Sequence, residues 1–210
     1  MAFEPDYGET LLTEEERDAL TAEAREVLGE PIRKADLYDL EQQIQDEVAD
    51  DLVTEVVDGA LTPSELLTDH FVRALHQQLY RPVWEWGGHQ RSRETNIGIA
   101  PERIAVELRN SLDDLRYQWE HATGVTPRYL GIAAHAALVH IHPFVDGNGR
   151  VTRLLADLLF LAAQDDEAVL AYDWEIDRRT YIRLLGEYDM TRNPTPLVEF
   201  ISVIELADEG

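Results

Sequence analysis

The apolar residues of this chain recur mainly at the three- and four-residue spacing of helices, with short polar breaks between the periodic stretches. From residue 35 to 57 they form a narrow stripe among acidic positions, whereas residues 129–141 are almost uniformly apolar. A narrow stripe is typical of a helix lying on a larger body, and an apolar run is typical of a buried helix. The pattern therefore predicts an all-α helical bundle.

Capping residues indicate where the other helices begin. Helices are predicted to start at Thr13, Thr62, Pro101, Thr126 and Asp177 and to end near residues 28, 80, 122, 141 and 188. Pro194 and Pro196 precede a last predicted helix that runs to about Ala207. Residues 91–99 depart from this pattern, because Asn96 and Gly98 favour a turn and Ile97 and Ile99 alternate as in a strand. We expect a small β-hairpin flap there.

Acidic residues dominate the first third of the chain. The net charge is −24, and residues 1–70 carry 21 acidic and 4 basic side chains. Such a field argues against direct nucleic-acid binding, which requires basic patches. Lys34 is the only lysine, and acid excess with little lysine is typical of salt-accumulating halophiles, where ionic strength screens self-repulsion. An acidic mesophile with GC-rich coding would have a similar composition.

The chain has no cysteine, which excludes disulfides and thiolate sites. Its sequence shows neither a signal-peptide pattern nor an apolar run long enough to span a membrane, so we expect a cytoplasmic protein.

The segment from His142 to Arg153 contains the candidate catalytic and ligand-binding residues. Pro143 favours a helix end at His142, which would leave the imidazole exposed as a base. Gly147 and Gly149 allow N–H groups to converge on an anion at the start of the next helix. Arg150 and Arg153 lie in the first turn of that helix, where positive charge is disfavoured unless a polyanion binds. With the carboxylate of Asp146 as a ligand for a hard metal ion, this set fits phosphate transfer on a nucleotide.

Simpler interpretations exist for single residues. Gly-Asn-Gly is common in loops, and Arg153 could pair with Asp157 on the helix surface. A metal site at His135, His140 and His142 is disfavoured, because the last two point to different sides of a helix and no carboxylate triad accompanies them. We also expect Trp84, Trp86 and Trp174 to lie in the core.

The segment matches every specified position of H-x-F-x-[DE]-G-N-G-R-x-x-R, and the chain thereby resembles the Fic (Fic/Doc) family. This resemblance implies a Fic-type bundle that binds ATP with Mg²⁺ and transfers AMP to a Ser, Thr or Tyr hydroxyl of a target protein. It also implies a role for each motif residue: His142 as base, Asp146 as metal ligand, Phe144 as the anchor of the loop, Gly147, Asn148 and Gly149 as phosphate cradle, and Arg150 and Arg153 as phosphate ligands. Tyr181 is our candidate for a wall of the adenine pocket.

Doc-like phosphotransferase toxins lack the Gly-Asn-Gly-Arg spelling, so AMP transfer is favoured over phosphate transfer. A nucleotide-gated binding module without catalysis is a third alternative. By resemblance, residues 61–210 would form the catalytic domain and residues 1–60 an acidic helical segment, and the flap would align the target. The oligomeric state stays open.

The segment from Trp84 to Arg91, after the helix ending in His76 to Tyr80, resembles the family's W-A-G-x-x-R. With the flap and the Tyr172-Asp173-Trp174 tail, it is similar to a subgroup called mobile mystery protein B. This likeness implies a helix-turn-helix or antitoxin-like protein partner.

Many Fic proteins are inhibited by an [ST]-x-x-x-E-[GN] helix whose glutamate binds the second motif arginine. No segment of this chain matches that pattern, and Thr54 to Gly59, with Asp58 in place of glutamate, comes nearest. We expect Glu41, in the middle of a helix, to reach Arg153 and act as a regulatory residue, so that Glu41→Gly raises self-modification while Asp58→Ala has little effect. One alternative is that Glu41 is a solvated acid like its neighbours.

Overall fold

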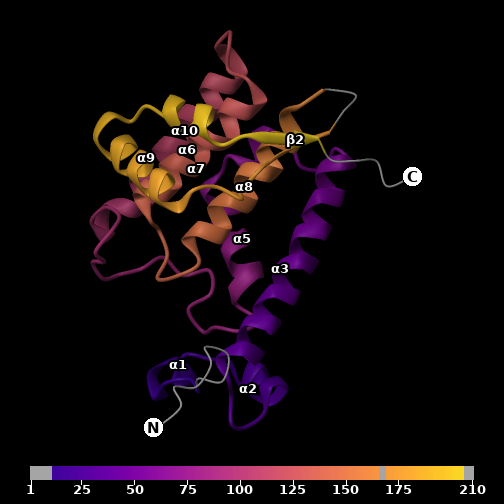
Figure 1. Ribbon diagram of the computed structural model, residues 1–210, viewed down its shortest axis with the longest axis vertical. Coiled ribbons are helices and arrows are strands. Elements are labelled where there is room, and N and C mark those ends of the chain that lie inside the picture. The colour runs from indigo at the N-terminus through magenta and orange to yellow at the C-terminus, as the bar shows by residue number, and fades with distance from the viewer. Residues whose placement is uncertain (1–10, 166–168, 206–210) are drawn as a thin grey trace.

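The computed structural model describes residues 11–165 and 169–205, and the chain is mostly helical (Figure 1). The helices are α1 (Glu14–Asp18), α2 (Ala22–Leu28), α3 (Lys34–Val57), α4 (Pro63–Leu66), α5 (Asp69–Tyr80), η2 (Pro101–Arg103, a 3₁₀ turn), α6 (Ile104–His121), α7 (Pro127–Ile141), α8 (Asn148–Ala163), α9 (Arg178–Thr191) and α10 (Thr195–Phe200). The strands are β1 (Leu170–Tyr172) and β2 (Val203–Glu205).

Threonine caps divide two of the predicted helices. The Thr21 side chain accepts a hydrogen bond from the Ala24 N–H, so the segment expected to be one helix from 14 to 28 forms α1 and α2. In the same way Thr68 accepts from the Phe71 N–H and separates α4 from α5. In both places the hydroxyl satisfies a helix N-terminal donor, which favours a new start over continuation.

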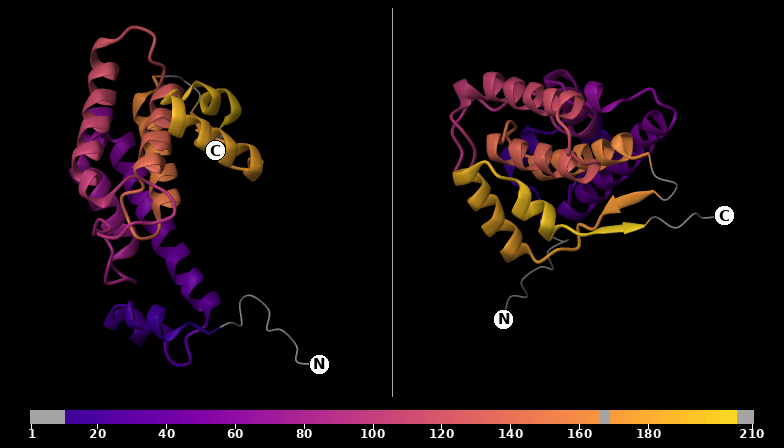
Figure 2. Two further views of the ribbon diagram at one scale, coloured as in Figure 1. Left: turned by 90° about the vertical axis from the view of Figure 1, so that its left-hand side faces the viewer. Right: turned by 90° about the horizontal axis from the view of Figure 1, so that it is seen from above.

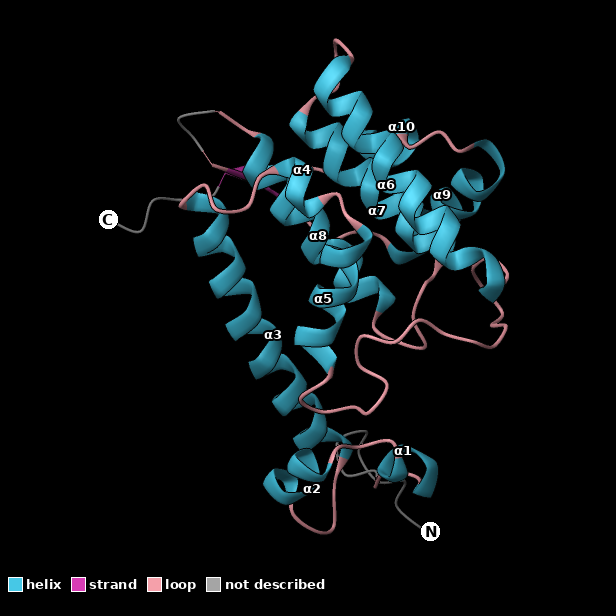
Figure 3. Ribbon diagram, turned by 180° about the vertical axis from the view of Figure 1, so that it is seen from behind, coloured by secondary structure: helices cyan, strands magenta, loops and turns pink. Residues whose placement is uncertain are grey.

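The buried central helix is α7, which packs against α6 on one side and α8 on the other. Its buried residues run from Leu130 to Leu138 without a break and include Ile141. Gly131 allows α8 to approach closely, since a Cβ there would lie 2.6 Å from the carbonyl oxygen of Ala156. Figure 3 shows α6, α7 and α8 together from behind.

The long helix α3 runs along the side of this bundle and packs against α5 and α8 (Figure 2). Leu37, Leu52 and Val56 of α3 are buried, and so is the carboxylate-bearing Glu41. The helices α1 and α2 lie at the N-terminal end of α3, at the end of the molecule away from α9 and α10 (Figures 1 and 2). The boundary near residue 60 as a division between domains stays a prediction.

A two-stranded antiparallel sheet joins the C-terminal part to the bundle, with Ala171 opposite Ile204. The expected last helix is therefore wrong beyond Phe200. The helix α10 has six residues, and Val203 to Glu205 pair with β1 because that edge offers ladder hydrogen bonds. Ala207 lies outside the described residues.

The prediction of an all-α bundle with a small β element is confirmed in outline, but the β element is β1–β2. Residues 91–100 form an irregular loop without paired strands, so the expected hairpin is absent there. Across the described ranges, each helix is too short or too polar to cross a bilayer.

Candidate active site

His142 ends α7 in a left-handed backbone conformation, with φ 52° and ψ 63°, and its N–H still donates to the Leu138 carbonyl. This conformation is uncommon for a residue other than glycine and is maintained by its surroundings. The loop of residues 91–100 packs directly on it, since a Cβ at Gly98 would lie 2.5 Å from the Cβ of His142. The loop thus fixes where the imidazole can lie.

Arg91 clamps this loop to the end of α7. Its guanidinium is buried and donates from Nε to the His142 carbonyl (2.7 Å) and from Nη2 to the Ile99 carbonyl (2.5 Å). Burial, and next the charge of Arg91, lower the pKa of His142 below its ordinary value. The imidazole is therefore neutral at pH 7, as a general base requires.

Asn148 closes the motif loop with its side chain. Its Oδ1 accepts from the Phe144 N–H (3.0 Å) and its Nδ2 donates to the Phe144 carbonyl (2.9 Å). We expected Asn148 in a phosphate cradle, but its side-chain amide is used within the loop, which leaves only its backbone N–H for a ligand. Phe144 is fully buried and stacks on the His76 ring, with centroids 3.7 Å apart.

Gly147 begins α8 with φ 74°, and a Cβ there would lie 2.3 Å from the Tyr80 ring. Its N–H donates to Asp146 Oδ1 (2.7 Å), which orients that carboxylate. No side chain caps α8, so the N–H groups of Asn148, Gly149 and Arg150 keep their hydrogen-bonding capacity. A helix N-terminus of this kind binds anions.

His76 of α5 supports the motif loop through hydrogen bonds of its ring. Its Nδ1 accepts from the Gly88 N–H (2.8 Å), and its Nε2 lies 3.2 Å from the Asp146 carbonyl. Burial lowers the pKa of His76 to about 4, so the ring is neutral and Nε2 is the donor. His76, which the sequence marked only as part of a family segment, thus holds the backbone of Asp146.

The motif side chains face two cavities. The first, here the histidine cavity, has a volume of about 540 Å³, and its motif residues are His142, Asn148, Gly149 and Arg153. The rest of its lining is mainly apolar and comprises Ile97, Val139, Trp174, Ile176, Tyr181, Ile182 and Leu185, together with Arg178. The second, here the aspartate cavity, has a volume of about 620 Å³ and is lined by Asp146, Arg150, Glu41, Lys34 and Trp84 among others. The two motif arginines therefore line different cavities.

Glu41 contacts Arg150 instead of Arg153. Its Oε2 lies 2.7 Å from Arg150 Nη1, its Oε1 accepts from Trp84 Nε1 (2.7 Å), and the residue is 6% exposed. The prediction that Glu41 pairs with Arg153 is therefore wrong. Arg153 lies three residues further along α8 than Arg150, which is a rise of about 4.5 Å, and its side chain points in a different direction. The alternative of a solvated Glu41 is also wrong.

Tyr181 lies in the wall of the histidine cavity, and Trp174, which we expected in the core, lies there too. Trp174 Nε1 donates to both carboxylate oxygens of Asp157 (2.9 and 3.1 Å). Burial raises the pKa of Asp157 to about 7. The pair between Arg153 and Asp157 that the spacing allowed does not form.

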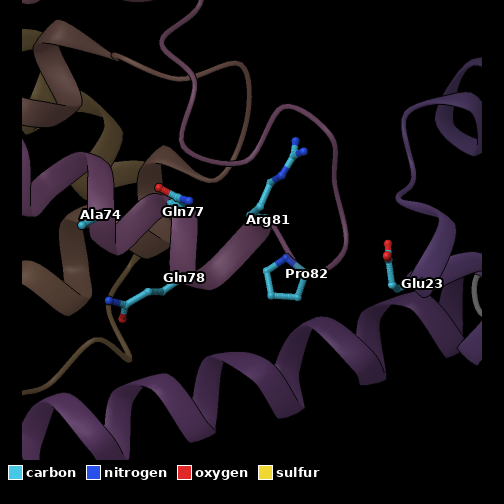
Figure 4. Close-up of a pocket in the computed structure, with 6 residues that line it drawn as sticks. All are labelled: Glu23, Ala74, Gln77, Gln78, Arg81 and Pro82. Carbon is cyan, nitrogen blue, oxygen red and sulfur yellow. The ribbon is translucent and has the colours of Figure 1, made fainter.

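A further cavity of about 680 Å³ lies between α5 and α2 (Figure 4). It contains no motif residue, and its arginine, Arg81, pairs with Glu85 (3.0 Å). We do not assign it to the reaction.

Asp146 is exposed and suits a hard divalent cation such as Mg²⁺. Within the described ranges, no group of three or more His, Cys, Asp or Glu side chains could hold a metal ion alone. Mg²⁺ commonly binds one or two carboxylates together with substrate phosphates, and Asp146 beside an anion-binding helix start fits that arrangement.

Sequence comparison identifies relatives. The Fic/DOC family pattern matches residues 66–160. The chain is 36% identical over 157 residues to "Protein adenylyltransferase Fic" of Drosophila virilis and 27% identical over 155 residues to that of Drosophila ananassae. Each alignment covers 72% of this chain but only 31% and 30% of the relative, so the chain spans about a third of their length.

Solved structures share the fold. The N-terminal Fic domain of a putative cell filamentation protein from Bartonella quintana has a TM-score of 0.60 at 20% identity, covering 80% of this chain and 82% of that one. The same domain with bound ADP has a TM-score of 0.59 at 20% identity, covering 81% and 86%. BepC from Bartonella tribocorum, with bound AMPPNP, has a TM-score of 0.54 at 19% identity and covers 89% and 100%.

Proposed function

Since the match over residues 66–160 makes this chain a Fic/DOC family protein, we propose that it is a protein adenylyltransferase. It transfers AMP from ATP to a Ser, Thr or Tyr hydroxyl of another protein. The observation that supports this most is the makeup of the histidine cavity, where a neutral imidazole, a helix start and an apolar wall meet. If the adenine ring of ATP binds against that apolar wall, the α-phosphate, which is the phosphate nearest the nucleoside, lies next to His142. The names of the Drosophila relatives agree with this activity.

The reaction follows from the positions of the side chains. The target hydroxyl attacks the α-phosphorus, the bond from that phosphorus to the bridging oxygen breaks, and diphosphate leaves. The Nδ1 atom of His142 is buried, so Nε2 takes the hydroxyl proton. The N–H groups at the start of α8 and the two arginines hold the phosphate oxygens. Bound Mg²⁺, with Asp146 as its protein ligand, would neutralise charge on the phosphates.

Parallel reactions with ATP labelled at the α- or the γ-phosphate test this function. We expect protein labelling from the α position, and a loss of about 10²–10⁴-fold in His142→Ala because the base is absent. His140→Ala is the matched control, since His140 lies two residues away and pairs with Asp189 (2.7 Å).

Label from the γ position alone would contradict AMP transfer and indicate a Doc-like phosphotransferase. Nucleotide binding without transfer of either label would indicate a binding module.

We also propose that Glu41 regulates the site through Arg150. The carboxylate occupies a guanidinium donor that a phosphate would otherwise use. A nucleotide must share or displace it to bind Arg150 fully.

For the subgroup and the partner we keep the proposals that the sequence supports, namely mobile mystery protein B and a helix-turn-helix or antitoxin-like protein. Co-purification of such a protein with the tagged chain would test the partner.

A further inference from the structure

Arg153 differs from Arg150 in what surrounds it. Among the described residues, no carboxylate lies within 4.0 Å of the Arg153 guanidinium, whereas Arg150 has Glu41. The guanidinium instead lies over the start of α8, since a Cβ at Gly149 would be 3.5 Å from Arg153 Nη1. An arginine with five donors needs acceptors to stay in one conformation.

Tyr181 of α9 offers an acceptor. Tyr181 lines the same cavity as Arg153, and the positive charge of Arg153 counteracts the burial that raises the pKa of Tyr181. The Tyr181 hydroxyl lies 2.7 Å from Nε2 of His135 on α7. The hydroxyl is therefore held by a side chain of α7, in the cavity that Arg153 of α8 also lines.

His135 is fully buried, and burial lowers its pKa to about 3, so the ring is neutral. A neutral imidazole nitrogen without a proton accepts a hydrogen bond, and a tyrosine hydroxyl has one proton to donate and lone pairs to accept with. If the hydroxyl donates to His135 Nε2, its lone pairs remain available to accept from Arg153. A hydrogen bond in such a buried site restricts the geometry of the groups that form it.

We propose that His135 and Tyr181 are positioning residues that hold Arg153 over the start of α8, where it binds a phosphate of the nucleotide. Tyr181 thus has two separable parts. Its ring belongs to the apolar wall of the histidine cavity, and its hydroxyl sets the position of a phosphate-binding arginine. This inference rests on the proposed function only in that the ligand of Arg153 is a nucleotide phosphate.

Calorimetric affinities for ATP and for adenosine separate these two parts. Tyr181→Phe keeps the ring and removes the hydroxyl, so we expect about a tenfold loss of affinity for ATP and no change for adenosine. Leu185→Ala, which alters only the apolar wall, should weaken both ligands by the same factor. In an Arg153→Ala background, Tyr181→Phe should have no further effect on ATP, because the group that it positions is gone.

His135→Leu should behave as Tyr181→Phe does, and His135→Gln, which keeps an acceptor, should restore much of the affinity for ATP. Equal losses for ATP and adenosine in Tyr181→Phe, or additive effects of Tyr181→Phe and Arg153→Ala, would overturn the proposal. So would a folded wild-type protein that binds no ATP. A wild-type protein that binds ATP with the expected mutant pattern but transfers no AMP would contradict the proposed function alone.

Discussion

At the scale of single residues, the charge of His142 controls whether the proposed reaction can begin. Burial and Arg91 lower the pKa of His142, so its neutral form already dominates at pH 7. We expect kcat/KM for AMP transfer to be flat between about pH 7 and 8 and to fall only below the ordinary imidazole value of about 6.5. Initial rates from pH 5 to 8, with circular dichroism as a check on folding, measure this. An acid limb centred above pH 7 would contradict it.

Gly147 is required for steric reasons. With φ 74° and the Tyr80 ring 2.3 Å from a Cβ, Gly147→Ala combines backbone strain with a clash. We expect a loss of about 2 kcal/mol or more in the free energy of unfolding, measured by urea denaturation.

Gly186 provides the matched control for this substitution. It lies within α9, and a Cβ there would meet no atom within 4 Å. Gly186→Ala should stabilise the protein by about 0.5–1 kcal/mol, because alanine favours the helix. Equal effects at the two positions would show that the geometry of Gly147 is not what requires glycine.

The motif residues could be identified from the sequence because their types and spacing are specific within one short segment. The roles of His135, Trp174 and Asp157 could not, because each depends on contacts between helices that are distant along the chain. Trp174 Nε1, for example, finds Asp157 only once the segment after β1 packs on α8. The split of Arg150 and Arg153 between two cavities likewise follows from packing on either side of α8.

At the scale of elements, α3 brings Glu41 to Arg150. Glu41→Gln keeps the helix and an acceptor for Trp84 Nε1 but removes the charge that neutralises Arg150. We expect affinity for ATP to rise, on the order of tenfold, since a hydrogen bond to a charged group contributes about 1.5–3 kcal/mol. Self-labelling from α-labelled ATP should rise with it.

Asp58→Asn is the control for this charge change, because Asp58 lies exposed at the C-terminal end of α3. This substitution should leave the affinity for ATP and the self-labelling unchanged. Lower activity in Glu41→Gln than in wild type would mean that Glu41 holds Arg150 in its active position instead of competing with the nucleotide.

The bounds of the long periodic helices were predictable to within three residues: α3 begins one residue before its predicted start, and α9 ends three residues after its predicted end. Elements of three residues were not, because β1 and β2 are defined by their pairing and not by local periodicity. Residues 91–100 show the converse. Their alternation is typical of a strand, yet the side chain of Arg91 donates hydrogen bonds to the carbonyl groups of Arg93 and Ile99, which pairing between strands would have used.

At the scale of the whole molecule, acidic side chains repel one another. On α3, the exposed acids Asp46, Asp50, Glu47 and Asp51 include like charges four residues apart, which destabilises a helix. If the composition is a halophilic trait, the unfolding temperature should rise steeply between dilute buffer and molar KCl, where the Debye length falls to about 3 Å.

Sucrose at matched osmolality is the control, since it strengthens burial without screening charge. An unfolding temperature that is high in dilute buffer and does not change with KCl concentration would contradict the halophilic interpretation.

Three of the four tryptophans line the two cavities on either side of the motif: Trp84 and Trp86 the aspartate cavity, and Trp174 the histidine cavity. The indole of Trp84 is bonded to the carboxylate that pairs with Arg150, and that of Trp174 to the carboxylate of Asp157. Indole emission responds to the polarity and charge around the ring. The protein therefore carries its own optical reporters, and a ligand entering either cavity will alter its ultraviolet fluorescence without an attached dye.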